Sequence, residues 1–212
     1  LPTETSAVAH YIEGCTDTAA RDGLAILGSQ GGYIWLPGII EDNPLAVIDT
    51  GIKVPLWQYR TENRIPSIEL MQSHLSRYVN ENLKTCLGGL SDFKAQYTIV
   101  EKGDIQTETT LTSQLVSFKV TYPIDIINKE GKKITDIHDF QVDVPYKLKD
   151  MYEVAKAIME KESADAKLEK ITIDLLALDS SIPLVGSELS CSKKVWLASD
   201  VQSKIKTLAR TN

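Results

Sequence analysis

The first half of the chain carries two stretches in which apolar residues recur every three or four positions, the spacing that places them on one face of an α-helix. One stretch runs from Ser6, a residue type that caps helix N-termini, to Gly28, a residue type that ends helices. The other runs from Ser67 to Leu87 and is followed by Gly88. The pattern predicts two amphipathic helices. Their apolar faces consist of Val8, Tyr11, Ile12, Cys15, Ala19, Ile26 and Leu27 in the first, and of Ile68, Met71, Leu75, Tyr78, Val79, Leu83 and Cys86 in the second.

From residue 93 to residue 148 the apolar positions alternate with polar ones, the period of a β-strand with one buried face. Residues 112–114 and 129–132 interrupt the alternation and suit hairpin connections. The pattern predicts a meander of four or five antiparallel strands. Four prolines punctuate residues 33–66, where short strands are expected only at 46–49 and 52–57.

Helical spacing returns at residues 148–162 and ends at a break over residues 163–165. Residues 171–175 alternate and predict a strand that rejoins the sheet, and residues 199–208 predict a C-terminal helix with Ser199 as its cap. Helices that flank an antiparallel meander define an α+β fold. We expect one domain over residues 1–212, with a helical and aromatic part (1–92), the sheet (93–148) and a helix, strand and helix (149–212).

The composition narrows the class of protein. The 212 residues carry a net charge of −6 and a pI near 5.2, without the clustered basic stripe that binding to nucleic acid requires. The longest apolar runs are shorter than the roughly 18 residues of a membrane helix, and the first residues lack the layout of a signal peptide. A hydrophobic content of 42% is enough to build a globular core. Because the chain is acidic and lacks a basic stripe, we expect no nucleic-acid partner.

Candidate catalytic and metal-binding residues are few. His10, His74 and His138 lie in different elements without a matched nucleophile, so we expect histidines on the surface. Asp136 and His138 share one side of a strand but lack a third ligand, and the nearby Asp125, Asp139 and Asp143 are expected to be polar outward positions. The glycines of residues 28–32 follow a helix, whereas phosphate-binding loops follow a strand. From these candidates we expect no catalytic residue, metal site or cofactor site.

Two features favour binding to a partner instead. Tyr33, Trp35, Trp57 and Tyr59 belong to an aromatic and proline-rich stretch that either packs on the core or lines a ligand or partner surface. The strand-rich middle contains many Thr and Val residues and offers sheet edges to which another chain can add strands. The lysines at 119, 129, 132 and 133 can instead guard those edges.

The three cysteines are too few for a disulfide scaffold and too far apart for a local zinc site. Cys15 and Cys86 each fall on the buried stripe of a predicted helix, so that helix packing brings them together either as a bridge or as two free thiols. Cys191 is then the third cysteine, or the partner of one of the other two.

Several segments resemble a group of uncharacterised membrane-anchored surface proteins of small-genome archaea. The similar segments are residues 11–15 (YIEGC), 24–34 (LAILGSQGGYI), 65–67 (IPS), 78–87 (YVNENLKTCL) and 120–123 (VTYP). Proteins of this group begin with a membrane helix followed by an extracytoplasmic domain and carry the two helix cysteines. The resemblance implies an ectodomain whose anchor lies outside this sequence, an oxidising exterior and a bridge between Cys15 and Cys86. It supplies no catalytic residue.

These observations lead to one expected function and one alternative. We expect a non-enzymatic structural or adhesive protein of the cell surface, secreted or anchored, such as the subunit of an extracellular filament that associates with itself or with other surface proteins. The alternative is an extracytoplasmic ligand-binding or sensor domain whose pocket lies in residues 33–59. A hydrolase that uses His138 ranks third.

Overall fold

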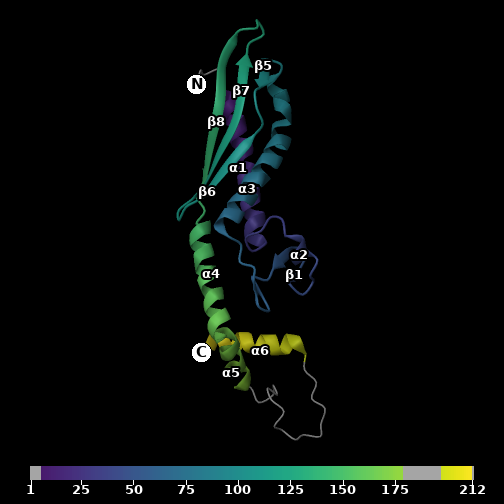
Figure 1. The fold of residues 1–212 in the computed structure, drawn as a ribbon, viewed down its shortest axis with the longest axis vertical. Coiled ribbons are helices and arrows are strands. Elements are labelled where there is room, and N and C mark those ends of the chain that lie inside the picture. The colour runs from purple at the N-terminus through teal and green to yellow at the C-terminus, as the bar shows by residue number, and fades with distance from the viewer. Residues whose placement is uncertain (1–5, 179–196, 212) are drawn as a thin grey trace. The chain divides into compact units, whose positions relative to one another are not determined.

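The computed structural model describes residues 6–178 and 197–211 and has the expected α+β fold, with helices beside an antiparallel sheet (Figure 1). The chain divides into two compact units, residues 1–156 and residues 157–212. Cys191 lies outside the described residues.

The two predicted N-terminal helices are confirmed as α1 (Ser6–Ser29) and α3 (Ile68–Leu87). The Ser67 hydroxyl accepts a hydrogen bond from the Leu70 amide and caps α3, which ends at Gly88 in the left-handed conformation. The chain turns at the end of α1 through a hydrogen bond from the Gly32 amide to the Leu27 carbonyl, 2.8 Å long. The glycines of this turn therefore end a helix, as expected. A 3₁₀ helix, η1 (Gly88–Phe93), follows α3.

The predicted meander is confirmed as four antiparallel strands. They are β5 (Thr98–Glu101), β6 (Gln106–Leu111), β7 (Val116–Ile127) and β8 (Lys133–Val144). The central strand, β7, pairs with β8 over nearly its whole length. On its other side β7 pairs first with β6 and then with β5, so that β6 and β5 share one edge of the sheet.

Alternate residues of β7 form the centre of the core. These buried residues are Val116, Phe118, Val120, Tyr122, Ile124 and Ile126. They face α1 and α3, which cover one face of the sheet, with α1 against β8 and α3 against β6 (Figure 1). The opposite face of the sheet carries exposed polar residues, including Glu108, Lys119 and Gln141.

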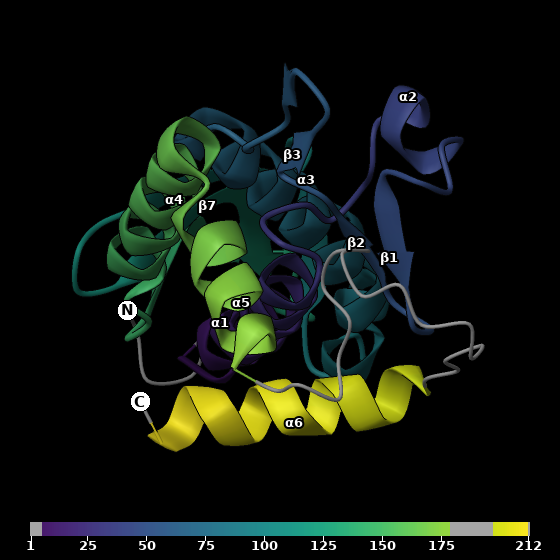
Figure 2. The same cartoon turned by 90° about the horizontal axis from the view of Figure 1, so that it is seen from below.

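Along the chain, a short helix, α2 (Gly38–Glu41), and two small hairpins lie between α1 and α3. The first hairpin pairs β1 (Val47–Asp49) with β2 (Lys53–Pro55), and the second pairs β3 (Gln58–Tyr59) with β4 (Glu62–Asn63). The first confirms the two short strands predicted for this segment. α2 lies next to the β1–β2 hairpin in both views (Figures 1 and 2).

The remaining helices are α4 (Leu148–Asp165), α5 (Lys167–Ala177) and α6 (Ala198–Thr211). The predicted strand at residues 171–175 is wrong, because this segment is part of α5. The Glu162 carboxylate accepts hydrogen bonds from the amides of Leu168 and Glu169, which satisfies donors in the first turn of α5. The break between α4 and α5 falls at Ala166, whose φ is 47°, instead of at residues 163–165. α6 begins before Ser199, which is therefore not its cap, and it contacts α5 (Figure 2).

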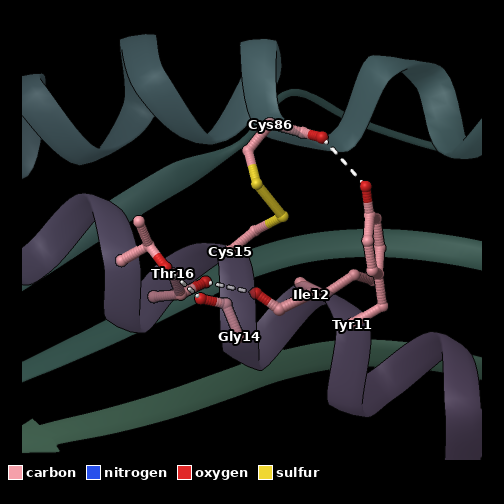
Figure 3. Close-up of a disulfide and its surroundings, with 7 residues drawn as sticks. Tyr11, Ile12, Gly14, Cys15, Thr16 and Cys86 are labelled. Atoms are coloured by element: carbon pink, nitrogen blue, oxygen red, sulfur yellow. Dashed lines mark hydrogen bonds between the residues drawn. A yellow bond between two sulfur atoms is a disulfide. The ribbon is translucent and has the colours of Figure 1, made fainter.

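A disulfide joins Cys15 of α1 to Cys86 near the end of α3, with the two Cα atoms 5.9 Å apart (Figure 3). Cys15 is buried, but Cys86 is exposed, so the expectation that both sulfurs lie on buried stripes is wrong for Cys86. The bridge joins the middle of α1 to the last turn of α3, where the two helices pack together. The Tyr11 hydroxyl adds a hydrogen bond to the Cys86 carbonyl, 3.1 Å long, across the same contact. Among the described helices, none combines the length and the apolar character needed to cross a bilayer.

Candidate functional site

Within the described residues, two edges of the sheet have no strand beside them: the outer edge of β8, and the edge shared by β6 and β5. The lysines proposed as guards do not protect β6. Lys119 lies on the central strand, and Lys129 and Lys132 lie in the turn between β7 and β8. Lys133 begins β8 and forms an ion pair with Asp125, 2.8 Å long.

One hydrogen bond sets which backbone groups face the open edge of β6. The Thr112 amide donates to the Leu115 carbonyl across the β6–β7 turn, 3.0 Å away. In an antiparallel ladder, hydrogen-bonded pairs alternate with pairs whose amides and carbonyls point outward. Counting back from Thr112, the outward residues of β6 are Leu111, Thr109 and Thr107. The open edge of β6 therefore presents the backbone groups of two threonines and one leucine.

The same alternation applied to β8 gives a different edge. Because Val116, Phe118 and Val120 bond toward β8, the outward residues of β8 are the partners of the residues between them. These partners are Asp139, Gln141 and Asp143. The β7–β8 pairing also contains two register shifts, and charges and bulges are the devices by which proteins protect sheet edges. The edge of β8 is thus better guarded than that of β6, whose one charged residue, Glu108, bonds toward β7.

A row of polar side chains joins α3 to β6. The Ser76 hydroxyl donates to the Thr109 hydroxyl, 2.8 Å away. Asn80 lies one helical turn further along α3, and Thr107 lies two residues earlier on the same face of β6. The side-chain oxygens of both Asn80 and Thr107 are buried and have no hydrogen-bond partner. The contact between α3 and β6, next to the open edge, therefore contains two unsatisfied polar atoms.

A pocket of about 240 Å³ lies between the end of α3 and the segment that connects β5 to β6. Lys84 and Asp104 line this pocket as a long ion pair of 3.8 Å. Glu101 and Tyr122 line it as well. Burial raises the pKa of the Tyr122 hydroxyl, and the charge of Glu101 and their hydrogen bond raise it further. Tyr122 is therefore a neutral hydrogen-bonding group here.

Two of the four aromatic residues expected either to pack on the core or to line a ligand or partner surface satisfy their polar atoms inside the fold. The Tyr33 hydroxyl donates to the Arg64 carbonyl, and the Trp57 indole donates to the Gly31 carbonyl, each over 2.8 Å. Tyr33 is buried and Trp57 is half-buried. These contacts tie the hairpin segment to the end of α1.

The other two aromatic residues stack with arginines. Arg77 lies over the Trp35 ring at 4.3 Å, and Arg64 lies over the Tyr59 ring at 5.0 Å. Trp35 also lines an open pocket of about 350 Å³, together with the ion pair of Lys53 and Glu41. The structure thus gives the four residues different roles, and Trp35 lines a pocket.

The three histidines occupy different environments. His10 and His138 are exposed, but the expectation of a surface histidine is wrong for His74, which is half-buried and accepts a hydrogen bond from the Ile34 amide, 3.1 Å away. Burial lowers the pKa of His74, and the charge of Arg77 lowers it further. His138 Nε2 lies 2.6 Å from the Asp136 carboxylate. Across residues 6–178 and 197–211, no group of three or more His, Cys, Asp or Glu side chains is arranged to hold a metal ion.

Sequence reasoning predicted an open edge in the sheet but neither its location nor the polar side chains between α3 and β6. The i, i+4 spacing of Ser76, Asn80 and Lys84 beside the apolar face of the helix was the signal that could have revealed this polar row.

Comparison with known proteins adds no relative: no family model, curated protein or solved structure matches the chain. The functional argument therefore rests on the geometry of the molecule.

Proposed function

We propose that this protein is a non-enzymatic structural or adhesive protein of the cell exterior that associates with neighbouring copies by strand addition at β6, as in a filament. The observation that carries the proposal is the difference between the two sheet edges. β8 places two aspartates at its outward positions, whereas β6 places Thr107, Thr109 and Leu111 there. An unguarded edge is a template for another strand, because its amides and carbonyls have no partners.

The disulfide supports an exterior location. Bridges between cysteines persist in oxidising compartments and are rare in the reducing cytosol. Alkylation of the denatured, unreduced protein tests this part of the proposal. We expect Cys15 and Cys86 to resist labelling. Labelling of all three cysteines would remove both the bridge and the argument for the exterior.

A proline scan of the two edges tests strand addition. Thr107→Pro removes an outward amide of β6 and leaves the ladder with β7 intact, and Gln141→Pro is the matched change on β8. Light scattering after size exclusion and negative-stain microscopy would measure assembly over a range of concentrations. We expect ordered polymers from the wild-type protein and from Gln141→Pro, and monomers from Thr107→Pro.

Circular dichroism of each variant must match the wild type for the comparison to count. If a proline variant unfolds, Thr110→Lys and Gln141→Lys replace the pair, because both side chains are exposed on their edge strands and a lysine at an edge also blocks pairing. A wild-type protein that stays monomeric at all concentrations, or a folded β6 variant that still polymerises, contradicts self-association through β6.

The pocket beside Trp35 favours a second candidate, a ligand-binding or sensor domain. An aromatic wall with a few polar groups at the rim is the usual form of a small-molecule site. Titration with a panel of amino acids and monosaccharides, followed by tryptophan fluorescence, tests this candidate. Saturable binding to a stable monomer that is lost in Trp35→Ala would support it over assembly.

A further inference from the structure

The two sulfurs of the bridge between Cys15 and Cys86 differ in their access to solvent. Cys15 is 5% exposed and belongs to the hydrophobic core, whereas Cys86 is exposed in the last turn of α3. Backbone atoms within a helix are largely covered by the helix itself, so the exposed surface of Cys86 belongs mainly to its side chain. A nucleophile that approaches the bridge from solvent therefore reaches the Cys86 sulfur first.

Access determines which sulfur is attacked in thiol–disulfide exchange. A thiolate that attacks Cys86 Sγ forms a new S–S bond there, and the old bond breaks with its electron pair on Cys15 Sγ. Cys15 then takes up a proton, equivalent to the one that the attacking thiol gave up. We infer that Cys86 is a modification site at which a small external thiol is attached as a mixed disulfide, while Cys15 is released as a buried thiol. This inference goes beyond strand addition and does not depend on it.

Contacts that involve neither sulfur hold α1 against α3 when the bridge opens. The two helices approach closely away from the bridge, where a Cβ added at Gly23 would lie 2.8 Å from the Tyr78 ring. Beside the bridge, the Tyr11 hydroxyl donates to the Cys86 carbonyl (Figure 3). These contacts keep Cys15 next to the mixed disulfide, so that its thiol can attack Cys86 and release the external thiol. Attachment at Cys86 is therefore reversible.

The position of attack is tested with sulfite, which cleaves a disulfide as a thiol does but leaves an S-sulfonate on the sulfur that it attacks. The full-length protein carrying Cys191→Ser would be treated with sulfite without an oxidant, quenched with acid, alkylated in denaturant and mapped by mass spectrometry. The same reaction in urea is the matched control, because unfolding exposes both sulfurs. We expect the S-sulfonate on Cys86 to exceed that on Cys15 roughly tenfold in the folded protein, and the two to be similar in urea.

The rate at which glutathione opens the bridge tests whether exchange occurs on the folded protein. Gly32→Ala changes the turn after α1, at a distance in sequence from both sulfurs, and destabilises the fold because Gly32 has φ +92°. If exchange required unfolding, this variant would speed it roughly thirtyfold, as the unfolded population rises. We expect instead a rate that is proportional to the glutathione concentration and equal in the two proteins within about twofold. Should Gly32→Ala fail to fold, urea below the unfolding transition supplies the same destabilisation.

The outcomes decide the inference without touching the β6 edge. An S-sulfonate shared evenly between the sulfurs of the folded protein, or found mainly on Cys15, overturns Cys86 as the site. A folded protein that does not react, or a rate that rises with destabilisation as unfolding predicts, shows that the bridge opens only in the unfolded chain and also overturns it. Loss of helical circular dichroism after sulfite treatment contradicts the held Cys15 thiol. Assembly in the scattering experiment tests the proposed function separately.

Discussion

Removal of the disulfide between Cys15 and Cys86 should cost the protein a large share of its stability. The bridge joins residues 71 positions apart, and a loop of this length restricts the unfolded chain by about 4 kcal/mol in the chain-entropy model. Either single alanine substitution opens the whole loop. Cys15→Ala, Cys86→Ala and the double variant should therefore lose nearly the same free energy of unfolding, since the second substitution removes nothing further.

Urea unfolding followed by circular dichroism measures these losses, in a background with Cys191→Ser to prevent mispairing. We expect a loss of about 4 kcal/mol, equivalent to a fall in Tm of roughly 10 °C for a unit of this size. The m-value should rise, because the opened chain exposes more surface on unfolding. Two results would refute the idea that the bridge acts by restricting the unfolded chain. One is a double variant whose loss of unfolding free energy equals the sum of the two single losses, and the other is a loss below about 1 kcal/mol with an unchanged m-value.

Three further predictions use the same unfolding assay. Gly14→Ala should stabilise the protein by about 1 kcal/mol, because Gly14 is exposed inside α1 and an added Cβ meets no atom within 4 Å. Gly32→Ala should destabilise by about 2–3 kcal/mol, because Gly32 has φ +92° and an added Cβ would lie 2.6 Å from Pro66; a loss as small as that of an ordinary surface change would contradict this. Stability should fall as the pH drops below 6.5, because the lowered pKa of His74 lets the unfolded chain bind the proton first, and His74→Gln should flatten this slope.

The sequence pattern was sufficient for most of the fold because burial follows a simple period. Alternate residues of β7 had to be apolar to face the two helices, and Ser67 and Gly88 marked the ends of α3 through their own local hydrogen bonding and backbone conformation. The strand predicted at residues 171–175 failed because its short alternation also fits a helix. The deciding contact, from Glu162 to the first turn of α5, depends on a side chain several residues upstream.

The candidate site was less accessible to such reasoning. Periodicity shows that Thr107 and Thr109 share a face, but not which backbone groups point away from β7. Which residues of β6 point their backbone groups away from β7 depends on the hydrogen bond from the Thr112 amide to the Leu115 carbonyl in the turn. The separation of Tyr33 and Trp57 from Trp35 was equally hidden, because it follows from hydrogen bonds to backbone carbonyls of distant residues.

The two edges of this sheet differ in their protection against aggregation. An open strand edge is an aggregation hazard in any protein, and β8 carries aspartates at the positions where they block pairing. On the opposite edge, β6 has threonines and a leucine at its outward backbone positions instead of aspartates. Thr110→Asp would place an exposed acid on β6, as Asp139 and Asp143 do on β8. If the edge has no partner, this change should leave assembly unaltered and improve solubility alone, whereas loss of assembly without loss of stability would identify β6 as an interface.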